Sequence, residues 1–520
     1  MPLENAFDPA EQSLRPVAWQ GTNDTARMET CTYMDFLYSF CIDLEISTMR
    51  ALLWFKQDLR LDDHPALQAG LAAKCLLPVY VLDPALLQLN AFGMRRMGVH
   101  RARFLLESLA ALEGELRQRG SRLLVVLGPA EQAIPQLVAQ LNLDRVLTLE
   151  EIAPDERAQV ARVARRLGNI PLQQAPANNL LRPDELPFSI EQLPPVFSRF
   201  RSLIEERLQV FQPRHAPDRL PELPDGALAL MQPLPRLSQL GLGEPLSVAA
   251  SAFPFSGGEP AALGRLRDYL WKTQGVRQYK DTRNGMIGSE YSSKFSPWLA
   301  NGSLSARRVV AELRRHEAQY KRNDSTHWLW VEMLWRDFFR WTLIRHGSAL
   351  FKAGGLKATE RAPQQLDQRF QDWSRGRTGM PLVDANMREL ATTGFMSNRG
   401  RQVVASYLIN DLQQDWRHGA AWFEEHLIDY DPASNWGNWA YLAGVGNDPR
   451  HNRVFNALRQ AREYDPDAQY VSLWLPELRD VPQALRHTPF LLAGGHLRSI
   501  GYPQLNSIPE SWKPYLHAVA

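Results

Sequence analysis

Residues 51–82 read ALLWFKQDLRLDDHPALQAGLAAKCLLPVYVL, and this stretch decides the fold of the first part of the chain. It contains two short apolar runs, ALLWF and LLPVYVL, separated by a longer polar segment. Similar runs follow as LLVVL, RVLTL and IPLQQ, with amphipathic stretches at 94–119 and 129–141 between them. Buried strands that alternate with helices predict a parallel sheet with right-handed crossovers, and so a Rossmann-like α/β domain at residues 49–175.

The first apolar run leads into WFKQDLRLDDHPAL, which contains no GxGxxG pattern. Such glycines are what allow the backbone to approach a pyrophosphate after the first strand of a dinucleotide-binding fold. A dinucleotide site of that type is therefore not predicted in the α/β domain.

The pattern changes twice after this domain. Residues 176–257 are rich in proline and lack periodicity, which predicts a long interdomain connector over the surface. From residue 258 to residue 500 the apolar period is helical, which predicts an all-α domain with helices at 259–271, 297–301, 306–320, 326–346, 384–392, 399–414 and 420–427. Residues 501–520 are expected to form a C-terminal tail, and residues 1–48 a disordered N-terminal extension.

The composition excludes several classes of protein. Hydrophobic residues make up 44% of the 520 residues and the net charge is +2, so nucleic-acid binding would need a local basic face. The three cysteines lack metal-ligand spacing, which argues against a zinc site and excludes an iron–sulfur cluster held by four cysteines. No apolar run approaches the ~18 residues that span a bilayer. We expect a monomeric, cytoplasmic protein.

A polar cluster with two separated tryptophans lies between residues 378 and 450. Trp439 and Trp416 lead away from it. Its side chains could converge on one polar planar ligand, the last two from a loop: Asn398, Arg401, Asp429, Asp431 and Asn435. This arrangement suits a flavin that exchanges single electrons, whereas a salt-bridged helix junction is the structural alternative.

Two further segments could contribute to a ligand site. Ser296 and Pro297 are typical of a helix start, where residues 292–296 would surround free backbone N–H groups, although ordinary capping explains them equally well. In the predicted helix 326–346, Glu332 lies on a face that is otherwise aromatic. An acid at such a position needs a partner or a function.

A set of motifs resembles the photolyase/cryptochrome family, and most closely its cryptochrome DASH branch, over roughly residues 50–478. These motifs are WFKQDLRLDDHPAL, SSKFSPWLANGSLS, LWRDFFRW, TGMPLVDANMREL, TGFMSNRGRQ, SNWGNW, AGVGNDPR and YVSLWLPEL. Each motif alone is a weak signal, but many matches in the same order are specific.

The resemblance implies that the α/β domain is an antenna domain and that the helical domain binds FAD in a U shape. Arg401 would pair with Asp429 against the flavin ring, and Asn435 would face its redox-active nitrogen. Carried over motif by motif, the cofactor-binding residues would be Tyr279, Ser292, Ser293, Lys294, Phe295, Ser296, Glu332, Trp335, Arg336, Asn398, Arg401, Asp429, Asp431 and Asn435.

The resemblance also implies a light-driven lyase, in which excited reduced FAD donates an electron to a cyclobutane pyrimidine dimer flipped out of DNA. The catalytic residues would be Glu332, Asn435, Trp439 and Trp416, and those at the DNA or the lesion Arg283, Trp335, Arg399, Gln402 and Tyr441. Gln402 and Tyr441 stand where duplex-active photolyases carry larger or less polar residues, which favours single-stranded DNA; RNA is a further candidate partner. The alternative is a blue-light photoreceptor that binds nucleic acid with little or no repair.

The tryptophan path departs from the family pattern. Family members usually pass electrons to the flavin through three tryptophans, of which Trp439 and Trp416 match the inner two, while Pro363 stands at the outer position. Photoreduction is therefore expected to be slow or to end on another aromatic residue. The family further implies an antenna, 5,10-methenyltetrahydrofolate, in the cleft between the domains, with Glu151 as a contact.

Overall fold

The computed structural model describes residues 48–207, 211–246, 248, 250–359, 365–448, 454–492, 494–505 and 508–516. The N-terminal extension expected at residues 1–48 lies outside these residues except for Thr48, and so does Pro363.

A five-stranded parallel sheet forms the α/β domain, which confirms the predicted fold class. Its strands are β1 (Arg50–Phe55), β2 (Cys75–Leu82), β3 (Leu124–Leu127), β4 (Arg145–Leu149) and β5 (Leu172–Ala175), in the order β3-β2-β1-β4-β5. Leu52 of the central strand β1 lies opposite Leu77 of β2 on one side. On the other side it lies opposite Val146 of β4. Parallel neighbours require crossover connections, and these supply the helices.

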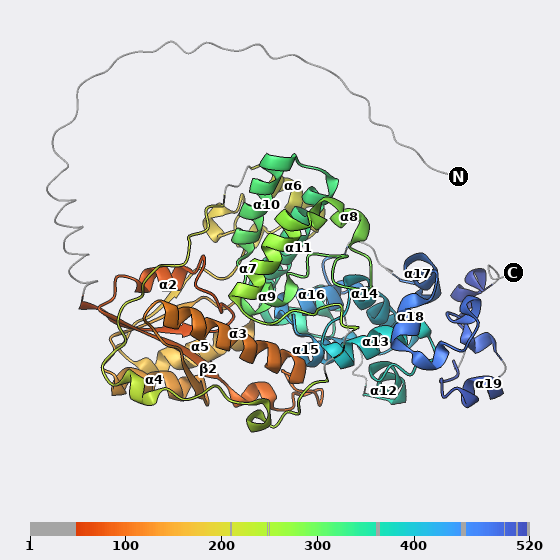
Figure 1. Ribbon diagram of the computed structural model, residues 1–520, viewed down its shortest axis with the longest axis horizontal. Helices are drawn as coiled ribbons and strands as arrows, with labels where there is room; N and C mark the ends of the chain where they lie inside the picture. The colour runs from red at the N-terminus through yellow and green to blue at the C-terminus, as the bar shows by residue number, and fades with distance from the viewer. Residues whose placement is uncertain are drawn as a thin grey trace, which may run out of the picture. The chain divides into compact units, whose positions relative to one another are not determined.

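Different helices cover the two faces of the sheet (Figure 1). They are α2 (Pro65–Gly70) and α3 (Val99–Gln118) on one face, and α4 (Ala130–Gln140) and α5 (Pro154–Leu167) on the other. Because side chains alternate along a strand, Leu53 packs with the first pair and Leu52 with the second, and both are 0% exposed. Each such leucine stabilises the fold by about 1.5–3 kcal/mol.

The connector contributes to the core of the helical domain as well as crossing the surface. Its helix α6 (Phe197–Glu205) packs against α11 (Asp324–His346), where the ring of Phe338 lies 5.7 Å from Phe197 and 5.3 Å from Phe200. The proline-rich pattern predicts a connector over the surface, and it does not reveal this packing.

The helical domain surrounds α11, which begins after Asn323, whose side chain accepts a hydrogen bond from the N–H of Thr326 (2.8 Å). Its other helices are α7 (Glu259–Arg267), α8 (Tyr279–Thr282), α9 (Ser296–Asn301), α10 (Ala306–Tyr320), α12 (Gln368–Ser374), α13 (Pro381–Thr393), α14 (Asn398–Ser406), α15 (Trp416–His426), α16 (Pro432–Leu442), α17 (Ala457–Tyr464), α18 (Gln469–Trp474) and α19 (Gly494–Ser499). The helix predicted at 399–414 ends at Ser406, where a π-helical turn, Tyr407–Asp411, follows.

Charged side chains join the two domains. Nη2 of Arg308 in α10 lies 2.7 Å from Oδ1 of Asp62, which follows β1. Glu259 of α7 accepts a hydrogen bond from the backbone N–H of Leu61 (2.8 Å). These buried contacts hold the carboxyl ends of the strands against the helical domain, so that a cleft can form between them.

The described part of the segment after residue 500 packs on the helical domain. Trp512 is 1% exposed, and its ring lies 6.2 Å from that of Tyr407. The hydroxyl of Tyr502 donates to Oδ2 of Asp384 in α13 (2.6 Å). The core of the helical domain therefore continues beyond residue 500.

Candidate functional site

A cavity lies within the helical domain, between the loop before α9, helix α11, helix α14 and the start of α16. The predicted cofactor-binding residues that line it are Tyr279, Ser292, Ser293, Lys294, Phe295, Ser296, Glu332, Arg336, Asn398, Arg401, Asp429 and Asp431. The fold thus brings together positions that are far apart in the sequence.

A smaller cavity adjoins the first. The two share part of their walls, namely Asn398, Arg401, Asp429, Asp431 and Ser434. Three further predicted residues line the smaller cavity: Gln402, Asn435 and Trp439. We call the two the main cavity and the ring cavity.

Arg401 and Asp429 form an ion pair in the shared wall. Nη2 of Arg401 lies 2.8 Å from Oδ2 of Asp429, whose side chain is 2% exposed. Nε of Arg401 donates to the carbonyl of Met396 (3.0 Å), which fixes the guanidinium. The other oxygen of Asp429 is buried without a hydrogen-bond partner in the described part of the chain. The pair therefore leaves one acceptor available to a ligand.

Asn435 belongs to helix α16, so its prediction as a loop residue was wrong, whereas Asp431 lies directly before the helix. Asp431 is the N-cap, whose side chain accepts from the N–H of Ser434 (2.7 Å), and Pro432 occupies the first turn. An aspartate followed directly by proline is a helix-start signal that was present in the sequence.

Arginines of α11 keep Asp431 ionised. Nη1 of Arg340 lies 3.1 Å from Oδ2 of Asp431. Burial opposes the charge, but Arg340 and then Arg336 attract it, and the pKa of Asp431 stays below its usual 3.8. A buried carboxylate of fixed charge is thus available as a hydrogen-bond acceptor in the shared wall.

The loop before α9 contains a buried lysine in an unusual backbone conformation. Lys294 has φ 63° and is 2% exposed, and its ammonium lies 3.2 Å from the ring centroid of Tyr291. Burial lowers the pKa of Lys294 well below 10.5. The predicted cap at Ser296 was wrong: α9 begins at Ser296, after Phe295, and the helix has no side-chain cap.

Glu332 has the partner that its position requires. Its carboxylate forms a short ion pair with Nη1 of Arg283, whose guanidinium lies 5.0 Å from the ring centroid of Trp328. Burial raises the pKa of Glu332 above 4.5, although Arg283 lowers it. The acid is therefore closer to protonation near neutral pH than a solvated glutamate is.

Trp335 is the predicted cofactor residue that lines neither the main cavity nor the ring cavity. It stacks on Phe197 of the connector, with ring centroids 3.6 Å apart and planes 14° apart. Its ring also meets Tyr441 edge-on at 6.0 Å. The structure thus places Trp335 beside Tyr441, another residue predicted at the lesion, and not in the cofactor wall.

Trp439 connects the ring cavity to the aromatic core. Its ring packs closely on Gly419, where any side chain would collide with it. Its ring contacts are Phe423 at 5.1 Å and Trp373 at 6.3 Å. The second predicted relay residue, Trp416, is 0% exposed and meets Trp436 edge-on at 5.8 Å.

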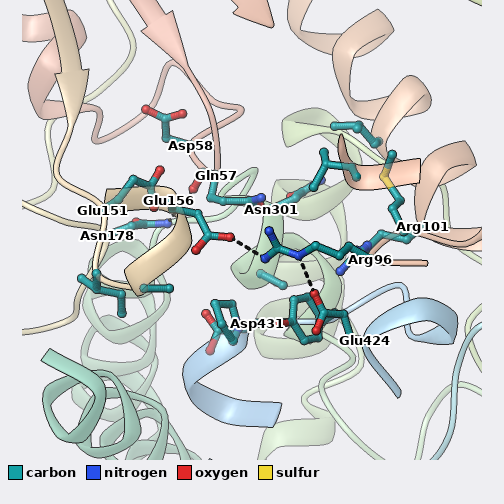
Figure 2. A pocket seen from close by; sticks show the side chains of 18 of the residues that line it. Gln57, Asp58, Arg96, Arg101, Glu151, Glu156, Asn178, Asn301, Glu424 and Asp431 are labelled. Carbon is teal, nitrogen blue, oxygen red and sulfur yellow. Dashed lines mark hydrogen bonds and ion pairs between the residues drawn. The ribbon is translucent and has the colours of Figure 1, made fainter. Parts of the chain in front are cut away.

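A third cavity lies between the two domains, and we call it the interdomain cavity (Figure 2). Glu151 lines it, 3.6 Å from Nζ of Lys56, and burial raises the pKa of Glu151 to about 7. Arg96 points into this cavity between Glu156 and Glu424, at 3.0 Å from each. Asp431 and Arg336 line both this cavity and the main cavity, which places the two side by side.

Comparison with known proteins agrees with this arrangement. The family model described as "DNA photolyase" matches residues 51–223, and that described as "FAD binding domain of DNA photolyase" matches residues 328–506. A cryptochrome DASH from Gloeobacter violaceus is 45% identical over 473 residues, which cover 88% of this chain and 93% of that protein. The chain belongs to the cryptochrome DASH family.

Solved structures extend the cryptochrome DASH likeness to both domains. A cryptochrome from Synechocystis sp. superposes with a TM-score of 0.84 at 41% identity, covering 91% of this chain and 99% of that one. An archaeal photolyase from Sulfolobus tokodaii, solved with two FAD molecules, superposes with a TM-score of 0.71 at 26% identity, covering 91% and 98%.

FAD is the cofactor of the matched domain, and the main cavity of this cryptochrome DASH protein fits it. Three buried polar atoms of its lining residues have no hydrogen-bond partner among the described residues: the Tyr291 hydroxyl, Nζ of Lys294 and Oδ1 of Asp429. An unmet buried donor or acceptor costs about 1–3 kcal/mol. A polar, anionic ligand that supplies these partners is the chemistry that the cavity requires.

Sequence reasoning missed Arg340, which holds Asp431 in this cryptochrome DASH site. Arg340 follows Arg336 by four residues on α11, so helical spacing would have placed both on one face. Tyr430, which lines both the ring cavity and the interdomain cavity, was also missed. Its position directly before Asp431 was the signal.

No helix in the part of the chain that the structure describes has both the length and the apolar character needed to cross a bilayer.

Proposed function

We propose that this protein repairs cyclobutane pyrimidine dimers in DNA under blue light, with a preference for single strands. The observation that carries the proposal is the ring cavity. Its wall combines the Arg401–Asp429 pair and Asn435 with Gln402, the position assigned to the lesion side. Bound reduced FAD supplies the chemistry, by lending the dimer an electron after excitation. The protein's own residues orient the two partners.

The cofactor would be held at both ends. Residues 292–296 and the buried Lys294 would bind the diphosphate of FAD, because an ammonium with no hydrogen-bond partner among the described residues suits a dianion. Arg401, Asp429 and Asn435 would orient the flavin ring. Asn435 is itself fixed, since its Nδ2 donates to the carbonyl of Ala420 (2.9 Å).

The lesion would meet an aromatic and basic rim. The guanidinium of Arg399 donates to Oδ1 of Asn284 (3.1 Å) and lies 4.5 Å from the ring centroid of Tyr464. These two contacts fix its orientation. Trp335 and Tyr441 would stack on the flipped bases, and such stacking contributes about 1–3 kcal/mol per base. Arg399 would bind a flanking phosphate.

The strand preference follows from the cost of flipping. Extruding a dimer from a duplex costs a few kcal/mol, and less from a single strand. Tyr441 and Gln402 offer the flipped dimer less apolar contact than larger or less polar side chains would, so the pocket offsets less of this cost. Single-stranded DNA is therefore the expected substrate, with RNA as a second candidate.

The proposal is tested with one oligonucleotide that contains a single dimer. The protein, with its flavin chemically reduced, is illuminated with the oligonucleotide as a single strand and as a duplex. We expect repair of the single strand to be faster by about tenfold to a hundredfold, as a difference of a few kcal/mol requires. Binding of both forms without repair would contradict the proposal and favour the alternative, a blue-light photoreceptor.

The interdomain cavity would hold the antenna, 5,10-methenyltetrahydrofolate. Its polar lining suits a pterin ring, which carries both donors and acceptors, and Glu151 would accept from them. The archaeal neighbour with two FAD molecules makes a second flavin the competing occupant.

The change Glu151→Gln tests this assignment. We expect folate binding to weaken about 10-fold to 100-fold, because a hydrogen bond to a charged group contributes about 1.5–3 kcal/mol. FAD content should not change. The matched control is Glu113→Gln on α3, where the carboxylate pairs with Arg117 at 2.8 Å outside the cavity. The released chromophores are identified by chromatography, and unchanged folate in Glu151→Gln would refute the contact.

A further inference from the structure

A row of aromatic rings leads from the ring cavity toward the surface. Trp439 in the cavity wall is 6.3 Å from Trp373 of α12, measured between ring centroids, with the planes at 77°. Trp373 is 5.5 Å from Phe370, and Phe370 is 6.2 Å from Trp422 of α15. Trp373 is 0% exposed, whereas Trp422 is partly exposed. The row therefore starts at the cofactor wall and ends at solvent.

The predicted path through Trp416 lacks an aromatic residue at its outer position. Trp416 is fully buried, and its Nε1 donates to the carbonyl of Ala353 (3.1 Å). The next position outward in the family pattern is Pro363, and proline has no ring that can be oxidised. The Trp373 row is thus the better supported connection to the surface.

We propose that the electrons that photoreduce the flavin enter the protein at Trp422 and reach Trp439 through Trp373. This inference rests on the proposed function, because it supplies the reduced flavin that repair needs. One electron leaves the indole of Trp439 for light-excited oxidised FAD. Trp373 replaces that electron and Trp422 replaces the next, with Phe370 as the bridge between them. A thiolate in solution then returns one electron to Trp422 and becomes a thiyl radical, which ends as a disulfide. A second such cycle completes the two-electron reduction of the flavin, whose proton comes from solvent.

The surroundings of Trp422 permit its oxidation. The imidazole of His426 stacks on its ring, with centroids 3.9 Å apart and planes 23° apart. Burial lowers the pKa of His426 to about 4, so the imidazole is neutral at pH 7 and places no positive charge against an oxidised indole. A neutral aromatic face is also one that stabilises a cation above it.

The indole N–H of Trp422 has no neighbouring acceptor for its proton among the described residues. Its Nε1 is buried and has no hydrogen-bond partner in the described part of the chain. Oxidised Trp422 therefore keeps its proton and persists as a radical cation, not as the neutral radical. This gives the route a signature that simple packing of aromatic rings does not have.

The experiment compares phenylalanine variants of the FAD-loaded protein by transient absorption, with dithiothreitol as the thiol. We expect Trp373→Phe and Trp422→Phe each to lower the yield of the long-lived tryptophan radical about tenfold or more, and the rate of flavin photoreduction equally. In the wild type the radical should have the spectrum of the cation, with a decay that is the same in heavy water. Trp474→Phe, a buried tryptophan of α18, is the control and should match the wild type.

Trp416→Phe decides between the two paths. A smaller loss than in Trp373→Phe supports the proposed route. A full loss in Trp416→Phe, with Trp373→Phe and Trp422→Phe unchanged, overturns it.

Dimer repair with chemically reduced flavin is measured in parallel and separates the two proposals. It should be equal in the wild type, Trp373→Phe, Trp422→Phe and Trp474→Phe if only photoreduction is affected. Its absence in the wild type would refute the proposed function and leave the radical measurements, and so this inference, standing.

Discussion

We expect the substitution Arg401→Ala to weaken FAD binding by about 10²–10³-fold. Arg401 is the close partner of Asp429, at 2.8 Å, and the Asp429 side chain is 2% exposed. Removing one member of a buried ion pair leaves an uncompensated charge, which costs about 3–5 kcal/mol. The empty protein can relax around this charge, but the flavin-bound state would have to enclose it. Flavin retention after dilution and dialysis measures the effect.

A second ion pair provides the matched control. Arg417 and Asp415 lie 2.7 Å apart with side chains 22% and 7% exposed, close to the 25% and 2% of Arg401 and Asp429. The Arg417 pair lines neither the main cavity nor the ring cavity. Arg417→Ala should therefore retain FAD, while thermal unfolding shows whether either variant is misfolded. Equal loss of FAD from both variants would contradict a specific role for Arg401.

The second large effect is expected at Glu332. Burial raises its pKa, which favours a carboxyl that can donate a hydrogen bond to the dimer while charge develops on it, and the contact with Arg283 fixes its position. Positioned acid groups of this kind accelerate reactions by about 10²–10⁴-fold, so Glu332→Ala should lower the repair rate by at least about 10²-fold. Glu332→Gln, whose amide still donates, should retain much more activity. Repair is measured with pre-reduced flavin, after FAD content has been checked.

The pH profile distinguishes donation from a structural role. Because the pKa of Glu332 is raised, the protonated form persists to higher pH than in water and is lost as the pH rises through that pKa. Wild-type repair should therefore fall with rising pH, and the Glu332→Gln profile should be flat over the same range. Glu312→Gln is the control, since Glu312 also pairs with an arginine, Arg315, and accepts from a tryptophan, Trp271. A flat wild-type profile would refute donation by Glu332.

The sheet could be predicted because each strand carries its signal locally. The apolar runs at 51–55 and 76–82 differ by one residue from β1 and β2. The strand order could not be predicted in the same way, because pairing such as Leu52 with Val146 depends on contacts across long stretches of chain. The pattern of apolar residues indicates which side chains are buried, but not which neighbouring strand or helix buries them.

In the site, too, some positions could be predicted from the sequence and others could not. Motifs identify Arg401, Asp429 and Asp431, and the structure places all three in one wall. The position of Trp335 could not be inferred, because the ring that covers it, Phe197, comes from a connector without periodicity. Placing Asn435 on a loop was avoidable, since the start of its helix is encoded in two adjacent residues, Asp431 and Pro432.

Two separate requirements act on the buried residue Trp373. The protein core requires an aromatic ring of roughly this volume, and a phenylalanine would satisfy most of that requirement. Electron transfer requires an indole that can be oxidised. Phenylalanine at this position would leave a protein that folds and binds flavin but has lost photoreduction. A screen for expression or thermal stability would not detect this loss. That the fold accepts a substitution therefore does not show that the substitution leaves photoreduction unchanged.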